Sequence, residues 1–223
     1  MSQLLLLLAI TAGAADQEFA PGIRVDKDKG TISIDAKVAP RKLNDEKYKG
    51  EIYPIEVIAC WPYPKGQKAH ETVVAVDVKP SDVHRAVESL GLKPGKPARA
   101  EGQTPEGPEV QIFLEVTGPD GQPRRVPIER SLVDRRTKKP APKLQWRFTG
   151  SVRTKPNPEK EETVYGADLT GTLIAIFPVT DQTVFQTNLT LKEEKYVKLE
   201  TNPEVVPKEG TAVKLVIGIG KAK

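Results

Sequence analysis

Residues 55–97 read IEVIACWPYPKGQKAHETVVAVDVKPSDVHRAVESLGLKPGKP and join two β-type segments to the clearest helical pattern in the chain. In residues 51–61 and 68–78, β-branched side chains recur with a period of two, which is typical of strands. The loop between the two segments is rich in proline and glycine, so we expect them to pair as a hairpin around it. Such a hairpin would bring Cys60 close to His70.

A helix is predicted over residues 80–91. Its apolar side chains recur at i, i+3, i+4 and i+7, as on the buried face of a helix: Val83, Ala86, Val87 and Leu90. Ser81 is placed to cap the free amides at the start of this helix. Gly91 provides a left-handed stop, and Pro94 prevents the helix from continuing.

The rest of the chain predicts short strands separated by turns. The 17 glycines and 20 prolines together exceed the average share of these residues, which favours many turns. Residues 26–30 and 118–121 have the composition of tight hairpin turns. We therefore expect an α+β fold that is predominantly β, with antiparallel sheets and one main α-helix.

The chain divides at a connector, residues 102–108 (GQTPEGP). An N-terminal half, residues 20–101, contains the cysteine and both histidines, and a β-rich C-terminal half covers residues 109–223. Composition leaves open whether these halves are two domains or one continuous domain.

Residues 1–15, MSQLLLLLAITAGAA, have the layout of a secretory signal peptide, in which an apolar run is followed by small residues. We expect cleavage near Ala14 or Ala15. A membrane anchor is the alternative, but a transmembrane helix needs about 20 apolar residues. The mature chain contains no apolar run of that length, so we predict an extracytoplasmic protein, periplasmic or secreted.

Composition excludes several classes of site. A single cysteine cannot form an internal disulfide, and an iron–sulfur cluster needs about four cysteine thiolates. The net charge of +4 is modest, and export argues against a nucleic-acid partner.

The groups that could bind a transition metal lie in one segment. Cys60, His70 and His84 could together hold zinc or copper, with Glu71 or Glu56 orienting the ligands. Their spacing matches no strong metal motif. The alternative is structural: a small buried cysteine, a hydrogen-bonded core histidine and a surface histidine at a helix start.

The chain contains no complete catalytic motif. Nucleophile elbows, phosphate-binding loops and dinucleotide fingerprints are all missing from the sequence, and residues 70–74 (HETVV) lack the second histidine of H-E-x-x-H. A Cys60 nucleophile paired with His70 would lack a third, orienting group. The sequence thus favours a protein that is not an enzyme.

Basic residues are concentrated between residues 124 and 143. The candidates for an anion-binding surface are Arg124, Arg125, Arg135, Arg136, Lys138 and Lys139. Such a surface could bind an anionic polymer or another component of the cell envelope. The alternative is that these charges are the solvated end of a hairpin.

The central segment also resembles the YdjY-domain family. The motifs that carry the resemblance are Ala59-Cys60, His70-Glu71, Pro80-x-x-x-His84 and Gly91-Leu-Lys-Pro-Gly95, followed by GSVRT at 150–154 and YGADLTGTLIAIF at 165–177. The family is functionally uncharacterised, so the resemblance implies no activity. Some members have been labelled iron–sulfur proteins, which the single cysteine contradicts for this chain.

The sequence therefore predicts an exported, non-catalytic binding or structural module of unknown ligand. The alternative is a zinc- or copper-binding protein that uses His70 and His84, together with Cys60.

Overall fold

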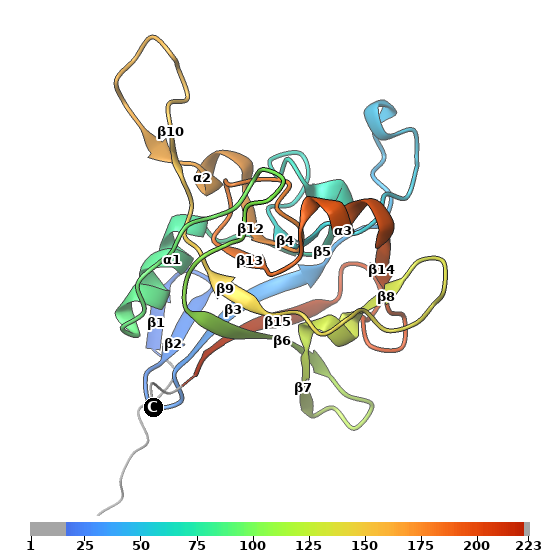
Figure 1. The fold of residues 1–223 in the computed structure, drawn as a ribbon. Helices are drawn as coiled ribbons and strands as arrows, with labels where there is room; N and C mark the ends of the chain where they lie inside the picture. The colour runs from blue at the N-terminus through green and yellow to red at the C-terminus, as the bar shows by residue number, and fades with distance from the viewer. Residues whose placement is uncertain (1–16, 221–223) are drawn as a thin grey trace, which may run out of the picture.

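Eight strands close into a barrel in the computed structural model, which describes residues 17–220 (Figure 1). Strands from both halves of the sequence build this barrel, three adjacent ones from the N-terminal half and five from the C-terminal half, and their side chains share one hydrophobic core. In spatial order the barrel strands are β3 (Thr31–Val38), β15 (Ala212–Ile219), β6 (Glu109–Thr117), β9 (Trp146–Phe148), β13 (Phe185–Thr187), β12 (Thr172–Ala175), β4 (Val57–Cys60) and β5 (Thr72–Val76), which pairs again with β3.

Further strands extend the barrel wall or form small ladders beside it. The β1 (Gln17–Ala20) and β2 (Ile23–Asp26) strands continue the sheet from β3, and β7 (Pro123–Pro127) continues it from β6. The small ladders are β10 (Arg153–Thr154) with β11 (Val164–Tyr165), and β8 (Leu132–Asp134) with β14 (Leu199–Thr201).

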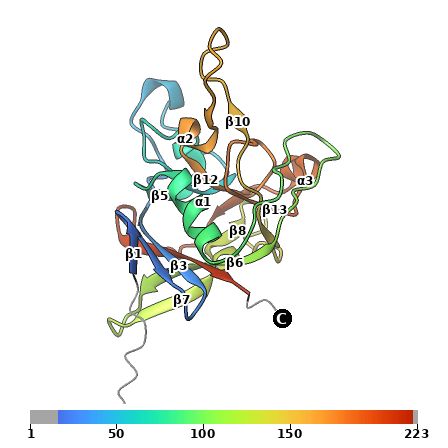
Figure 2. The same ribbon diagram turned by 90° about the vertical axis from the view of Figure 1, so that its left-hand side faces the viewer.

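Three α-helices are present in residues 17–220: α1 (Pro80–Ser89), α2 (Ala167–Thr170) and α3 (Leu191–Tyr196). Single 3-10 turns occur at η1 (Glu46–Tyr48), η2 (Ala69–Glu71) and η3 (Ile128–Ser131). Figure 2 shows α1 between the projecting β10–β11 hairpin and the strands β1–β3. No helix in this part of the chain has the length and apolar character needed to cross a membrane.

The predominantly β character predicted from the sequence is confirmed, but the prediction of purely antiparallel sheets is wrong. Two pairs of the barrel, β4–β5 and β12–β13, are parallel. The chain leaves β4 at Cys60 and runs back along the barrel through residues 61–71 before β5 begins, so Cys60 lies opposite Ala75. A period of two marks a strand in either orientation, so the sequence pattern could not distinguish a parallel pair from the expected hairpin.

The main helix is present, but its N-terminus is capped by a different residue from the one the sequence suggested. Lys79 is the N-cap residue and makes no side-chain cap. The backbone N–H of Ser81 instead donates to Oδ1 of Asp168, in α2, at 2.9 Å. The helix is thus capped across the fold, by a carboxylate whose negative charge also suits the positive end of the helix dipole.

This contact predicts a stability effect. Asp168→Ala should lower the free energy of unfolding by about 1 kcal/mol, because it removes both the cap and the charge at the helix end. Urea unfolding of the purified protein measures the change. Ser81→Ala serves as the control and should change stability by less than about 0.5 kcal/mol; a larger loss for Ser81→Ala than for Asp168→Ala would contradict the assignment.

Candidate functional site

Two carboxylates share one ammonium group beside β4. Nζ of Lys68 lies 2.5 Å from Oε1 of Glu71 and 3.2 Å from Oε2 of Glu56. Glu56 directly precedes β4, whereas Lys68 and Glu71 are the N-cap and the last residue of the η2 turn that leads into β5. The backward course of residues 61–71 brings these side chains together, and with His70 they are called here the Lys68 cluster.

The Lys68 cluster holds an exchangeable proton close to neutral pH. Burial, together with the negative charge of Glu71, raises the pKa of Glu56 to about 7. Burial alone would lower the pKa of Lys68, but the attraction of Glu71 and Glu56 outweighs it, so this pKa is raised. The lysine therefore stays charged, and Glu56 is the member of the cluster that changes protonation state near pH 7.

His70 lies at the edge of the Lys68 cluster. Its Nε2 is 3.4 Å from Oε1 of Glu71, and its ring stacks on Tyr48 at 4.6 Å and meets the edge of Tyr53 at 4.9 Å. Burial and the positive charge of Lys68 lower the pKa of His70. The imidazole is therefore neutral at physiological pH and is held by aromatic contacts.

Cys60 is fully buried at the end of β4. Its Sγ lies 3.8 Å from the carbonyl oxygen of Thr170, and burial raises the pKa of the thiol to about 11. At physiological pH this residue is a neutral thiol that faces a backbone carbonyl. These properties are unsuited to a cysteine nucleophile, which reacts as the thiolate.

His84 has a different set of partners. Its Nδ1 is 2.7 Å from the hydroxyl of Tyr165, its Nε2 is 3.4 Å from Oε1 of Glu88, and its ring meets the edge of Phe148. Burial lowers the pKa of this imidazole as well. His84 joins α1 to the foot of the β10–β11 hairpin and shares none of these partners with His70.

Within residues 17–220, no group of three or more His, Cys, Asp and Glu side chains is arranged to hold a metal ion. The structure brings His70, Glu71 and Glu56 together but gives His84 separate surroundings. The zinc or copper site stays a prediction from the sequence.

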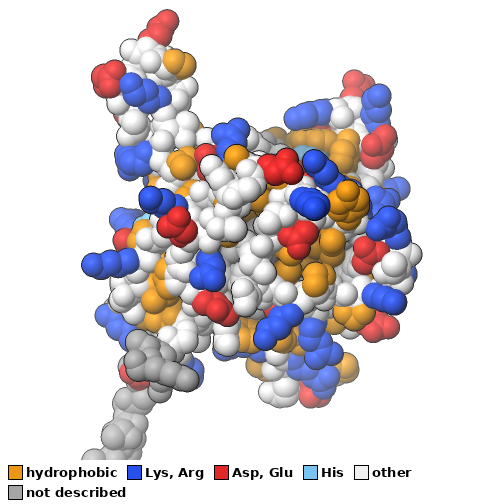
Figure 3. Space-filling view, in the orientation of Figure 1, with side chains coloured by type: hydrophobic (Ala, Val, Ile, Leu, Met, Phe, Trp, Pro, Cys, Tyr) orange, Lys and Arg blue, Asp and Glu red, His pale blue; other side chains and the backbone are white. Residues whose placement is uncertain are grey.

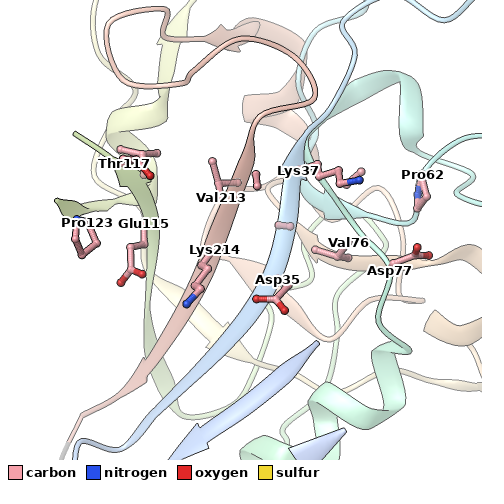
Figure 4. Close-up of a pocket in the computed structure, with 14 residues that line it drawn as sticks. Asp35, Lys37, Pro62, Val76, Asp77, Glu115, Thr117, Pro123, Val213 and Lys214 are labelled. Atoms are coloured by element: carbon pink, nitrogen blue, oxygen red, sulfur yellow. The ribbon is translucent and has the colours of Figure 1, made fainter. Parts of the chain in front are cut away.

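A groove of about 600 Å³ crosses the outer wall of the barrel over β5, β3, β15 and β6. Figure 4 shows Pro62 and Pro123 at its opposite ends. Lys214 of β15 lies in register between Asp35 of β3 and Glu115 of β6, so charges of alternating sign cross the floor. The groove therefore combines a proline at each end with charged side chains of both signs, three acidic and two basic, along its length.

A second hollow continues this groove. It measures about 260 Å³, shares Pro62 and Ala75 with the larger groove, and is bordered by Trp61 and Tyr63. Tyr63 is one of the few large apolar side chains exposed in the described chain. The two hollows together form a continuous surface from the aromatic loop after β4 to the β7 strand.

A family comparison matches the YdjY domain over residues 23–218. This match runs from the start of β2 into β15 and therefore covers the whole barrel. The chain belongs to the YdjY-domain family. No curated protein and no solved structure matches it.

The six basic residues of the predicted anion-binding surface fall into two groups in this YdjY domain. Arg124 and Arg125, on β7, pair with Asp120 and Glu115. The other group follows β8, where Arg135 donates to the carbonyl of Ile52 and Arg136 to that of Tyr196, next to Lys138 and Lys139. On the face seen in Figure 3, Lys and Arg side chains are interspersed with Asp and Glu. The anion-binding surface stays a prediction.

The sequence interpretation singled out Glu56, His70 and Glu71 but missed Lys68, whose ammonium group joins the two carboxylates. A signal for this residue was available, because Lys68 and Glu71 are separated by three positions and face each other whenever the segment turns helically. The predicted strand over residues 68–78 placed them on opposite faces instead.

Proposed function

We propose that this YdjY domain is an exported binding module, not an enzyme, and that its ligand lies in the groove over β5, β3, β15 and β6. The groove carries this proposal, because its volume of about 600 Å³ falls in the range of roughly 300–1,000 Å³ of ligand sites. The signal-peptide pattern of residues 1–15 supports export; that segment lies outside the described residues.

The side chains of the groove favour an extended polypeptide segment of the cell envelope as the ligand. The charged side chains that line the groove have both signs: Asp35, Asp77 and Glu115 are acidic, and Lys37 and Lys214 are basic. A polyanion would meet repulsion from three carboxylates here, whereas a peptide can place side chains of either sign opposite them and apolar side chains against the prolines.

The surroundings of the reactive side chains support a non-catalytic role. The Cys60 thiol is buried and faces the Thr170 carbonyl, and the His70 imidazole is directed at Glu71 between two tyrosine rings. A nucleophile and its base need to lie within hydrogen-bond reach of each other. Cys60 and His70 instead contact other groups, the Thr170 carbonyl in one case and Glu71 with the two tyrosines in the other, which does not suit a nucleophile and its base.

The test of the proposal is to fill the groove. Peptides selected from a random 12-residue library on the mature protein would be measured by fluorescence anisotropy. Ala212→Trp, on the exposed floor of the groove, should weaken binding by at least about tenfold, since it occupies space that the ligand needs.

Ala100→Trp is the matched control, because Ala100 is also exposed but lies outside the groove. Its peptide affinity should equal that of the wild type. Failure to select any peptide, or equal weakening by both tryptophans, would contradict the proposed site.

A further inference from the structure

A smaller cavity lies between the two loops that connect the parallel strand pairs. It measures about 180 Å³ and is formed by residues from the loop at 61–71, the loop at 176–184, the junction of α2 with β12, and the segment after α1. Most of its lining side chains can donate hydrogen bonds: Gln67, Lys68, Arg99, Thr170, Thr172, Thr180 and Gln182. This cavity is separate from the groove proposed above.

Thr172 provides an unused polar group in the lining of this cavity. The residue is fully buried, and its Oγ1 lies beside the Cys60 sulfur without making a hydrogen bond of good geometry. Buried hydroxyls in folded proteins almost always have a partner, so an orphan that lines a cavity points to a ligand.

The neighbouring threonines show how the remaining hydroxyls are committed. Oγ1 of Thr170 donates to the carbonyl of Gln182 and accepts from the amide of Thr172. Oγ1 of Thr180 accepts from the amide of Gln182, so its O–H is a donor. The lining is therefore fixed by internal hydrogen bonds, and Thr172 and Thr180 are the hydroxyls that can serve a ligand.

The charges of the lining are both positive. Lys68 and Arg99 are its charged members, and none of its described residues is an acid. The acids paired with these cations, Glu71 and Glu56 for Lys68 and Asp181 for Arg99, do not line the cavity. A ligand in the cavity thus meets cations and hydroxyl donors, which complement the oxygens of an anion.

We propose that this cavity binds a small oxyanion, the carboxylate or phosphoryl group of a small molecule, through Thr172 and Arg99. Arg99 has 67% of its side chain exposed and stands at the mouth, where its planar guanidinium can hold two oxygens of the anion. Thr172 donates from the buried end.

The test measures binding of acetate and of inorganic phosphate separately by isothermal titration calorimetry at constant ionic strength, with chloride as the reference. Arg99→Gln and Thr172→Val should each weaken binding at least about tenfold. The matched control is Arg85→Gln: Arg85 is 66% exposed and paired with Asp82, and its loss should leave affinity unchanged.

Thr172→Val also separates binding from folding. Because it removes an unpaired buried hydroxyl and keeps the side-chain shape, its unfolding midpoint should equal or exceed that of the wild type. Binding of acetate alone identifies a carboxylate ligand, and binding of phosphate alone a phosphoryl ligand. The proposal would be overturned if neither acetate nor phosphate gave more heat of binding than chloride. It would also be overturned if the Arg85 and Arg99 variants weakened anion binding equally.

Discussion

Gly171→Ala is expected to lower the free energy of unfolding by about 3 kcal/mol. Gly171 has a φ of +71°, and a Cβ atom added there would lie 2.5 Å from Cγ of Trp61. The ring cannot easily move away, because the indole N–H donates to the carbonyl of Val78 at 2.6 Å and the Trp61 amide donates to Gly171 at 2.9 Å. The substitution thus combines backbone strain with a steric clash, and urea unfolding measures the loss.

Gly121→Ala separates the two contributions. Gly121 has a φ of +74°, almost the same as that of Gly171, but nothing lies within 4 Å of its added Cβ. Its replacement should therefore cost only about 1 kcal/mol, the strain of the left-handed backbone. If the free energy of unfolding falls by the same amount in both alanine variants, close packing against Trp61 does not constrain residue 171.

Glu56→Gln should have an effect on stability that depends on pH. The folded protein raises the pKa of Glu56 to about 7, so the stability contributed by its protonated form is present below about pH 4.5 and is lost as the pH rises through 7. The amide resembles the protonated acid and cannot ionise. We expect the variant to match the wild type near pH 4.5 and to exceed its stability at pH 8 by about 2 kcal/mol, after allowance for the side chain's partial exposure.

Glu200→Gln is the control of opposite sign. Burial raises the pKa of Glu200, but the hydrogen bond from Arg41, supported by the Thr201 amide, outweighs burial, so the pKa is lowered. The stability that Glu200 contributes is present above its unfolded pKa and is lost in acid. Its replacement should destabilise the protein at pH 8 and have less effect as the pH falls through the folded pKa. Calorimetric melting between pH 4 and 8 compares both variants, and a Glu56→Gln protein less stable than wild type at pH 8 would refute the raised pKa.

Local signals in the sequence predicted the hairpins correctly. The turns at 26–30 and 118–121 join β2 to β3 and β6 to β7 as antiparallel neighbours. In both turns a glycine, Gly30 or Gly121, adopts a positive φ. Turn chemistry depends on a few adjacent residues, and it therefore specifies the pairing of the strands on either side.

The parallel pairs could not be predicted in the same way. The parallel partners are close in sequence, as Val57 with Thr72 and Ile174 with Phe185 show. Each parallel pair reaches its place in the barrel through the antiparallel contact of β4 with β12, which joins segments more than 100 residues apart, such as Cys60 with Thr172. A local turn also shaped the Lys68 cluster. Because η2 replaces the start of the predicted strand, Glu71 faces Lys68, and a cluster of charges forms where the sequence indicated a metal ligand and its neighbour.

The position of β15 has a consequence for the order in which the protein is completed. This strand is the last in the described chain, yet it pairs along most of its length with both β3 and β6. Until residues 212–219 have been synthesised, the barrel has two open edges at the place where they belong. A nascent polypeptide therefore cannot close its barrel from the N-terminal portion alone.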